Sequence, residues 1–520
     1  MSTVLQGVHV QNFAYDAAGS SPRSSRFTFS LGPAFDGTMP TRYRLYRRKG
    51  AGDTLPMHTT TPSQFAVVGV LMDTTHLPML GFTYHYHVVA EYDINGEEFV
   101  TEPSNVIDLT PSVPLQSSKH PSIPRGLRIN FVLLTYPDLQ VPWPKGYVEA
   151  MMFDSTPGAR SLRNYLWELT TGYSAAPPAA KLRAVQLQGK VIDWQNLSST
   201  SPTYAGLNAL SQELFPILDP IKEDNPADYY VVIINTGAGG GLAMGGDAVL
   251  VGAGEIDDVQ RFSTVVHEFG HRLDLGHSSG FWCGGALLPE KLDDASGCET
   301  GVYVDRTNPM SGSSSTAHLI GYHKSALGLF NGRTELAELT PGSVLEFDLF
   351  DSTTITATKD TQLLILSLDA YDSALIVEYR RPLGFNDRFV WGGNEIPAAR
   401  AVYVYYRPGR FANALAGTSD VWVPYEWFDW IEPVVATPEV DAYDPHWDLR
   451  VRVVKDLNYK VVVQVSRGVM PLQPLQPLQP IATKAVREDG RSRAPEALTP
   501  WASPSRRTAR ERDWCGWRRE

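Results

Sequence analysis

Hydrophobic and polar residues alternate through much of the first hundred residues. Every second residue from Tyr84 to Ala90 is apolar, which is typical of a β-strand with one buried face. The pair Asn95-Gly96 follows this run and precedes another, so it predicts a hairpin turn. We therefore expect residues 1–112 to form a β-sandwich. Residues 113–125, which are rich in Pro and Ser, are expected to form a linker.

The hydrophobic pattern changes after this linker. Residues 127–135 form an apolar run, which suits a strand buried on both faces. Apolar residues over 162–169 have the three- and four-residue spacing of an amphipathic helix, and residues 229–235 read as a second core strand. A further helix is predicted from apolar residues at the same spacing, Val259, Phe262, Val266, Phe269 and Leu273. Residues 126–335 are thus predicted to be an α/β (α+β) domain.

Strand-like runs return in the last third of the chain. Residues 336–468 are predicted to form a second β-sandwich from runs at 344–350, 363–368, 374–379, 401–407, 449–454 and 459–465. Residues 469–520 contain Pro-Leu-Gln three times and many arginines. They cannot bury a core, so we expect a disordered tail. The chain is therefore predicted to be multidomain, with a β-sandwich on either side of the α/β domain.

Composition excludes some classes of function. A content of 43% hydrophobic and 20% charged residues fits globular domains with real cores. The net charge of −12 argues against a general nucleic-acid-binding protein. No apolar run is long enough to span a membrane, and the first residues lack the pattern of a signal peptide. The compartment is therefore left open between the cytosol, export by another route and a sequence given without its leader.

The segment from His267 to His277 carries the most specific chemistry. On a helix, His267 and His271 lie one turn apart on the same face, so both imidazoles can bind one divalent ion at about 2 Å. Glu268 is too close to the first ligand to be a natural third one, but it can take a proton from a metal-bound water. Once the helix has ended, His277 can supply the third ligand. Three protein ligands and one open position are typical of a catalytic zinc site.

Other interpretations of these residues stay open. The segment could be a buried amphipathic helix whose three histidines make ordinary hydrogen bonds. Asp274 could bind the metal ion in place of His277. Cys283 and Cys298 bracket the loop that follows and could form one disulfide or stay reduced. Asp305 could orient a metal ligand or a turn.

The segment resembles the long zinc-binding signature of the metzincin metallopeptidases, His-Glu-x-x-His-x-x-Gly-x-x-His, with Asp274 at the position of the glycine. Aspartate tolerates the left-handed backbone that this glycine adopts. Residues 307–312, Thr-Asn-Pro-Met-Ser-Gly, resemble the methionine-containing turn of the family. Residues 318–324 and 376–384 resemble segments of the gametolysin-like branch, as do Cys283, Cys298, Tyr303, Asp305 and Met310.

The resemblance implies a zinc site and the roles of its residues. His267, His271 and His277 would bind Zn²⁺, Glu268 would act as the general base, and Met310 would pack beneath the metal. A helix over residues 317–330 would close the domain, with His318 and His323 as packing or surface residues. Residues 248–251 would form an edge strand, which either pairs with an extended peptide or is an ordinary capped edge.

Residues 1–112 resemble a fibronectin type III sandwich, with Tyr84 at the position of its corner tyrosine. Both β-sandwiches could bind protein or carbohydrate, and the aromatic cluster of residues 422–430 could contribute. The family resemblance also favours an extracellular protein.

These observations predict a zinc-dependent metalloendopeptidase whose partner is a protein or peptide substrate. The alternative is a secreted binding or adhesion protein with a structural or inactive metal site. A metallohydrolase that acts on a non-peptide bond would fit the same zinc chemistry. Glu268 separates the first two hypotheses, because a purely structural site does not need it.

Overall fold

The fold is known from a computed structural model. It describes residues 3–16, 25–30, 35–50, 54–68, 71–73, 82–110, 126–171, 185–197, 207–235, 241–243, 248–252, 258–273, 275, 277–282, 299–301, 305, 307–311, 317–330, 332–353, 360–368, 373–386, 388–391, 394–398, 400–407, 419–424, 435–438, 441–444 and 448–468. The chain divides into two compact units, and the second, residues 471–520, lies outside the described residues. The predictions for the linker, Asp274, Tyr303, the cysteine pair and the tail also fall outside them.

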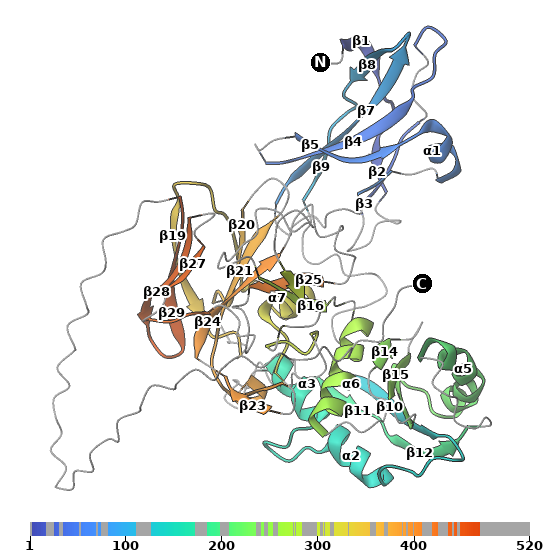
Figure 1. The fold of residues 1–520 in the computed structure, drawn as a ribbon, viewed down its shortest axis with the longest axis vertical. Helices are drawn as coiled ribbons and strands as arrows, with labels where there is room; N and C mark the ends of the chain where they lie inside the picture. Colours follow the sequence, from blue (N-terminus) through green and yellow to red (C-terminus); the bar gives the residue numbers. More distant parts are fainter. Residues whose placement is uncertain are drawn as a thin grey trace, which may run out of the picture. The chain divides into compact units, whose positions relative to one another are not determined.

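The described part of the chain is mostly β-sheet, with several sheets and few helices (Figure 1). Its N-terminal region contains two sheets and one short helix, α1 (Pro62–Val68). The larger sheet has the order β1 (Thr3–His9), β8 (Glu97–Glu102), β7 (Tyr84–Ile94), β4 (Arg42–Lys49) and β5 (Thr54–Thr60), with β9 (Ile107–Leu109) paired to β7. The smaller sheet consists of β2 (Ala14–Tyr15), β3 (Ser25–Thr28) and β6 (Leu71–Asp73).

The alternation of apolar and polar residues from Tyr84 to Ala90 correctly predicts strand β7. In β7 the side chains of Tyr84, Tyr86 and Val88 are fully buried. The hairpin between β7 and β8 turns at Asn95 and Gly96, which both have positive φ, as a tight hairpin turn requires. Membership of the fibronectin type III family remains a prediction.

The middle region is built on one sheet whose strands are mostly parallel. Its order is β11 (Gln186–Gln188), β10 (Gly126–Thr135), β13 (Tyr229–Asn235), β15 (Ala248–Gly252) and β14 (Gly241–Ala243), and β12 (Val191–Asn196) also pairs with β10. Strand β14 alone of these runs antiparallel to its neighbour. The helices are α2 (Lys145–Phe153), α3 (Leu162–Thr171), α5 (Leu207–Asp224) and α6 (Asp258–Arg272).

Strand β10 explains how this sheet is covered. Phe131 and Leu133 share a buried cluster with residues of α2, α3 and α6. Val132 and Leu134 point the other way and share a second cluster with residues of α5. Because successive side chains of a strand face opposite sides, helices cover both faces of the sheet. This is why the sequence of β10 reads as an unbroken apolar run.

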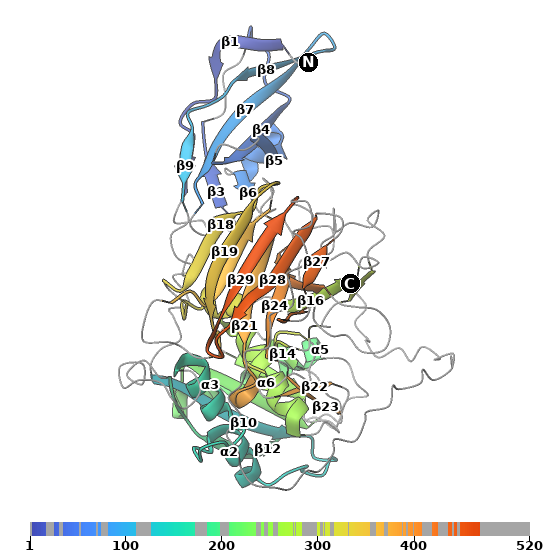
Figure 2. The ribbon, with the colours of Figure 1, turned by 90° about the vertical axis from the view of Figure 1, so that its left-hand side faces the viewer.

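The last region contains two large sheets. One has the order β17 (Glu299–Gly301), β16 (His277–Trp282), β25 (Ser419–Pro424), β24 (Ala401–Arg407), β21 (Ala374–Arg380), β20 (Leu363–Ser367) and β18 (Thr334–Glu338), and β26 (Val435–Ala436) pairs with β24. Figure 2 shows the other sheet, made of β19 (Val344–Phe350), β29 (Lys460–Arg467), β28 (Leu449–Asp456) and β27 (Ala442–Asp444). Strands β22 (Arg388–Trp391) and β23 (Asn394–Pro397) form a separate hairpin, after the 3₁₀ turn η1 (Gly384–Asn386).

Apolar residues from both sheets form one buried cluster, which includes Leu375 and Val377 of β21 and Val451 and Val463 of the second sheet. The two sheets therefore pack face to face. Strands β16 and β17 belong to the first sheet although they precede residue 336, where the sequence predicts the sandwich to begin. The closing helix is also shorter than predicted, since α7 covers only Gly321–Ala326.

Candidate metal centre

Helix α6 places the first two histidines. Its residues Val265, Val266 and Phe269 are buried in the same cluster as the apolar residues of β10 and β13. The ring of Phe269 meets the ring of Tyr229 edge-on, at 5.3 Å between centroids. This apolar side fixes the rotation of the helix against the sheet. His267 and His271 are consequently held on another face.

The structure brings the three predicted histidines together. The Nε2 atoms of His271 and His267 are 3.1 Å apart, and those of His271 and His277 are 2.9 Å apart. One ligand atom from each of the three lies within 4.8 Å of the others. Among the described residues, no other group of at least three His, Cys, Asp or Glu side chains is arranged to hold a metal ion. The cluster could therefore bind one.

The hydrogen bonds of the rings fix which nitrogens face the centre. Nδ1 of His267 lies 2.9 Å from the carbonyl oxygen of Pro309, and Nδ1 of His271 lies 2.9 Å from that of Leu275. A carbonyl oxygen only accepts, so both Nδ1 atoms are the donors and carry the ring protons. In the neutral rings each Nε2 then presents a lone pair to the centre. Burial, helped by the neighbouring His271, lowers the pKa of His267 to about 4, so this ring is neutral at pH 7.

Lone pairs that face each other at such distances repel unless a cation lies between them. Three nitrogens at about 2.0–2.1 Å from one tetrahedral ion would be about 3.3–3.4 Å apart. The two Nε2 separations of 3.1 and 2.9 Å are a few tenths of an ångström shorter, so a small outward shift of the rings would admit the ion. Hydrogen bonds from the opposite nitrogen of a metal-binding histidine to a carbonyl are also the usual means of orienting it. The donor set thus fits a divalent metal.

Met310 packs closely against α6 because the helix has a glycine at the point of contact. Met310 is fully buried. A Cβ atom placed on Gly270 would lie 3.0 Å from Met310 Cε and nearer still to its Sδ. The next segment is tied to the same turn, since the N–H of Ser278 donates to the carbonyl of Met310 at 2.9 Å. The residue predicted to pack beneath the metal therefore lies directly against the helix that carries two of the ligands.

Glu268 is buried between α6 and the antiparallel edge strand β14. It is 6% exposed. A Cβ atom on Gly241, the first residue of β14, would lie 2.6 Å from Glu268 Oε1 and 2.8 Å from its Cδ. The absence of a side chain at Gly241 thus leaves the space that the carboxylate occupies. The prediction that residues 248–251 form the edge strand is wrong, because β15 pairs with β13 on one side and with β14 on the other, which leaves β14 at the edge. The sequence gives no sign of the role of Gly241.

Asp305 connects the methionine turn to the strand that carries the third histidine. Its carboxylate accepts hydrogen bonds from Ser278 Oγ at 2.5 Å and from Thr307 N and Oγ1 at 2.8 and 2.7 Å. Burial raises its pKa, against these hydrogen bonds, which lower it. Ser278 directly follows His277, so Asp305 orients both the turn and the ligand strand. The sequence predicts that Asp305 orients a metal ligand or a turn, and its effect on a metal ligand stays a prediction.

The other two histidines of the region are both buried. His318 Nε2 lies 3.2 Å from Glu168 Oε2 on α3, and His323 Nδ1 lies 3.1 Å from Asn308 Nδ2. Burial lowers the pKa of His318 to about 4 and that of His323 to about 3. Both are therefore neutral packing residues, one of the two roles predicted for them.

Comparisons with known proteins give little further guidance. No protein-family model matches the chain, and no curated protein matches it. The twitchin kinase region from C. elegans is similar over 20% of this chain and 17% of its own length, at 15% identity and a TM-score of 0.15. OgpA from Akkermansia muciniphila is similar over 57% of this chain and 87% of its own, at 13% identity and a TM-score of 0.23.

A catalytically inactive OgpA in complex with an O-glycopeptide substrate shows the same coverage, at 12% identity and a TM-score of 0.21. The TM-scores of these likenesses are too low to carry an argument about fold or function. None of the described helices is both long enough and apolar enough to cross a membrane.

Proposed function

We propose that this protein is a zinc-dependent metalloendopeptidase. The observation that carries the proposal is the convergence of three imidazole Nε2 atoms, with the Nδ1 hydrogens of His267 and His271 directed to carbonyl oxygens. Zn²⁺ is the ion we assign, because a site of three histidines with an open position is typical of catalytic zinc. When bound, zinc would lower the pKa of a water towards neutrality and polarise the scissile carbonyl.

Residues of this chain would transfer the proton, bind the substrate and hold the metal ligands in position. Glu268 directly follows the ligand His267 and is buried against β14. It would take the proton of the attacking water and pass it to the leaving amine. The edge strand β14 would hold an extended peptide through backbone hydrogen bonds. Met310 and Asp305 would hold the metal-binding histidines in position without contacting the substrate.

The test compares the full chain with a Glu268→Gln variant. We expect the wild-type protein to bind one zinc ion and to cleave casein in a chelator-sensitive way. The variant should keep the zinc and lose cleavage by about 10²–10⁴-fold, because only the proton acceptor is removed. Glu149→Gln, at a half-exposed glutamate on α2, serves as the control. Equal cleavage by Glu268→Gln and wild type would refute the role of Glu268.

The binding-protein alternative predicts a different pattern. Zinc would bind to wild type and to the variant alike, but neither would hydrolyse peptides from a mixed library. Products from such a library would also separate an endopeptidase from a hydrolase that acts on other bonds.

A further inference from the structure

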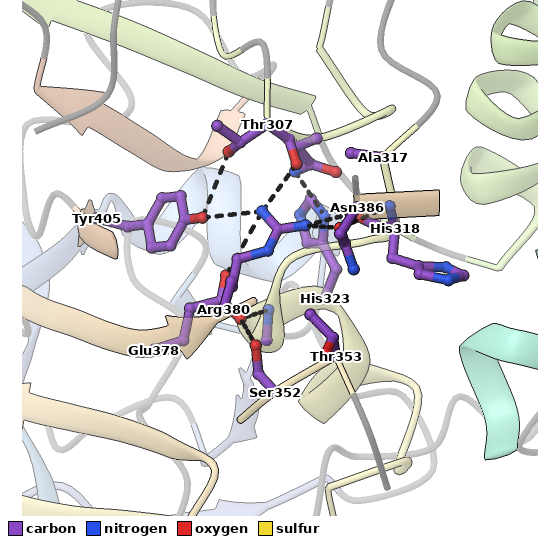
Figure 3. Close-up of polar contacts among 12 residues, drawn as sticks. Thr307, Ala317, His318, His323, Ser352, Thr353, Glu378, Arg380, Asn386 and Tyr405 are labelled. Carbon is purple, nitrogen blue, oxygen red and sulfur yellow. Dashed lines mark hydrogen bonds and ion pairs between the residues drawn. The ribbon is translucent and has the colours of Figure 1, made fainter. Parts of the chain in front are cut away.

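Arg380, the last residue of β21, is buried behind the metal centre and is 2% exposed. Figure 3 shows its guanidinium among residues from separate segments of the chain. Nη1 donates to the carbonyl oxygen of Thr307 at 2.9 Å and lies 3.3 Å from the hydroxyl of Tyr405. Nη2 donates to the carbonyl oxygen of His318 at 3.0 Å and to Asn386 Oδ1 at 2.6 Å. One planar group thus joins four partners.

A second charged residue of β21 enters the same buried layer. Glu378 precedes Arg380 by two positions and therefore points to the same side of the strand. Its Oε2 accepts hydrogen bonds from the backbone N–H of Gly321 at 2.9 Å and from Ser352 Oγ at 2.6 Å. Its Oε1 lies 3.9 Å from Arg380 Nη1, so the two charges partly compensate each other. The pair anchors the start of α7 as well as the methionine turn.

Two short chains of contacts connect Arg380 to the proposed metal ligands. Thr307, whose carbonyl it binds, lies two residues before Pro309, whose carbonyl accepts the Nδ1 hydrogen of His267. Thr307 also donates to Asp305, which in turn accepts from Ser278 next to the third histidine. The hydroxyl of Tyr405 lies 3.3 Å from Thr307 Oγ1 and supports the same turn.

The strand pairing brings the third ligand to the same sheet. His277 begins β16, and β16 pairs in parallel with β25, where His277 lies opposite Ser419. Strand β25 pairs with β24, and β24 with β21, which ends at Arg380. One sheet of the last region therefore contains both the proposed metal ligand His277, on β16, and Arg380, on β21, which anchors the methionine turn.

We infer that Arg380 is a positioning residue for the metal centre, which it serves by fixing the methionine turn that orients His267. The inference rests on the proposed function, because it assumes that the histidines bind zinc. The competing account is that Arg380 only satisfies buried carbonyls and contributes to stability like any other buried arginine.

Arg380→Lys separates the two accounts. Lysine keeps the charge but lacks the planar fork that reaches Thr307 and His318 together. Loss of a group that orients a ligand typically weakens metal binding by about 10–100-fold, and we expect this range for zinc. Tyr405→Phe removes only the hydroxyl that contacts the turn at Thr307, so it should also weaken zinc binding, by a smaller factor. It also provides a test if the lysine variant does not fold.

Arg467→Lys is the matched control. Arg467 is the last residue of β29, is buried, and donates to the carbonyl oxygens of Leu339 and Leu368. These two leucines belong to the buried cluster between the two sheets, whereas α6 and Met310 belong to another cluster. The Arg467→Lys variant should be less stable than the wild type but should bind zinc with the same affinity. A purely structural role for Arg380 predicts the same behaviour for both variants.

The experiment measures the zinc dissociation constant of each full-length variant by competition with a chelator, together with its thermal midpoint. The absorption spectrum of the Co²⁺-substituted protein reports the geometry of the ligands. Weaker zinc binding and an altered Co²⁺ spectrum in Arg380→Lys, but not in Arg467→Lys, support the inference. Zinc affinities within about twofold of wild type in both Arg380→Lys and Tyr405→Phe overturn it. Failure of the wild type itself to bind zinc refutes the proposed function instead.

Discussion

Gly241→Ala tests the packing of Glu268 against the edge strand. An alanine Cβ at this position would lie 2.6 Å from Glu268 Oε1 and 2.8 Å from Cδ, whereas heavy atoms in contact are normally about 3.5–4.0 Å apart. Glu268 would have to move by about 1 Å. It is buried on α6 against β14, so it cannot simply turn into solvent. The backbone of Gly241 does not have positive φ, and the substitution therefore acts through contact alone.

A displacement of about 1 Å in a catalytic group can cost about 100-fold in rate. This corresponds to about 2.7 kcal/mol of transition-state stabilisation. We expect kcat/KM for a peptide substrate to fall by about this factor, mainly through kcat, with the zinc content unchanged. Overpacking of the site should cost about 1–3 kcal/mol of stability as well.

The assay is steady-state hydrolysis of a quenched fluorescent peptide, with zinc content measured on the same preparation. Gly126→Ala is the matched control, because Gly126 also begins a strand and a Cβ there would meet nothing within 4 Å. The control should hydrolyse the peptide like the wild type. Wild-type kcat/KM in Gly241→Ala would contradict either the position of Glu268 against β14 or its role as the base.

Two further predictions concern stability. Gly270→Ala would place a Cβ against Met310, so thermal unfolding should show a loss of about 1–3 kcal/mol from overpacking, and Met310→Ala in the same chain should restore part of it. His318 has a folded pKa of about 4 and an unfolded pKa of about 6.5, so between these values the unfolded state binds the extra proton. Stability should therefore fall as the pH drops through this window, by about 2 kcal/mol at pH 5 from this residue. Urea unfolding of the zinc-free protein should show the fall, with a shallower pH dependence in His318→Gln; identical pH profiles would contradict the assignment.

The sequence predicts those parts of the site that depend on local spacing. His267 and His271 meet because side chains three to four residues apart lie on the same face of a helix. The apolar residues of α6 determine which face this is. Met310 and Asp305 are singled out by a short local segment; in the structure Met310 lies against α6, and Asp305 accepts a hydrogen bond from Ser278 beside the third histidine. The hairpin at Asn95 and the alternating burial of β7 follow from equally local rules.

Contacts between distant segments could not be predicted in this way. Nothing near Gly241 in the sequence indicates that Glu268 fills the space beside it, because that contact depends on how α6 crosses the sheet. Arg380 lies within residues 376–384, whose sequence resembles a gametolysin-like segment, but its hydrogen bonds to Thr307 and His318 depend on tertiary structure. The pairing of β16 with β25 likewise crosses the predicted boundary at residue 335 and has no local signal.

The pairing of β16 with β25 also has a consequence for synthesis of the protein. A ribosome releases residues in order, and Ser419 emerges long after His277. The strand that holds the third imidazole can pair early with β17 on one edge, but it lacks β25 on the other edge until most of the polypeptide has been made. We expect unfinished nascent chains to bind zinc poorly, so the proposed hydrolytic activity would be absent until synthesis is nearly complete.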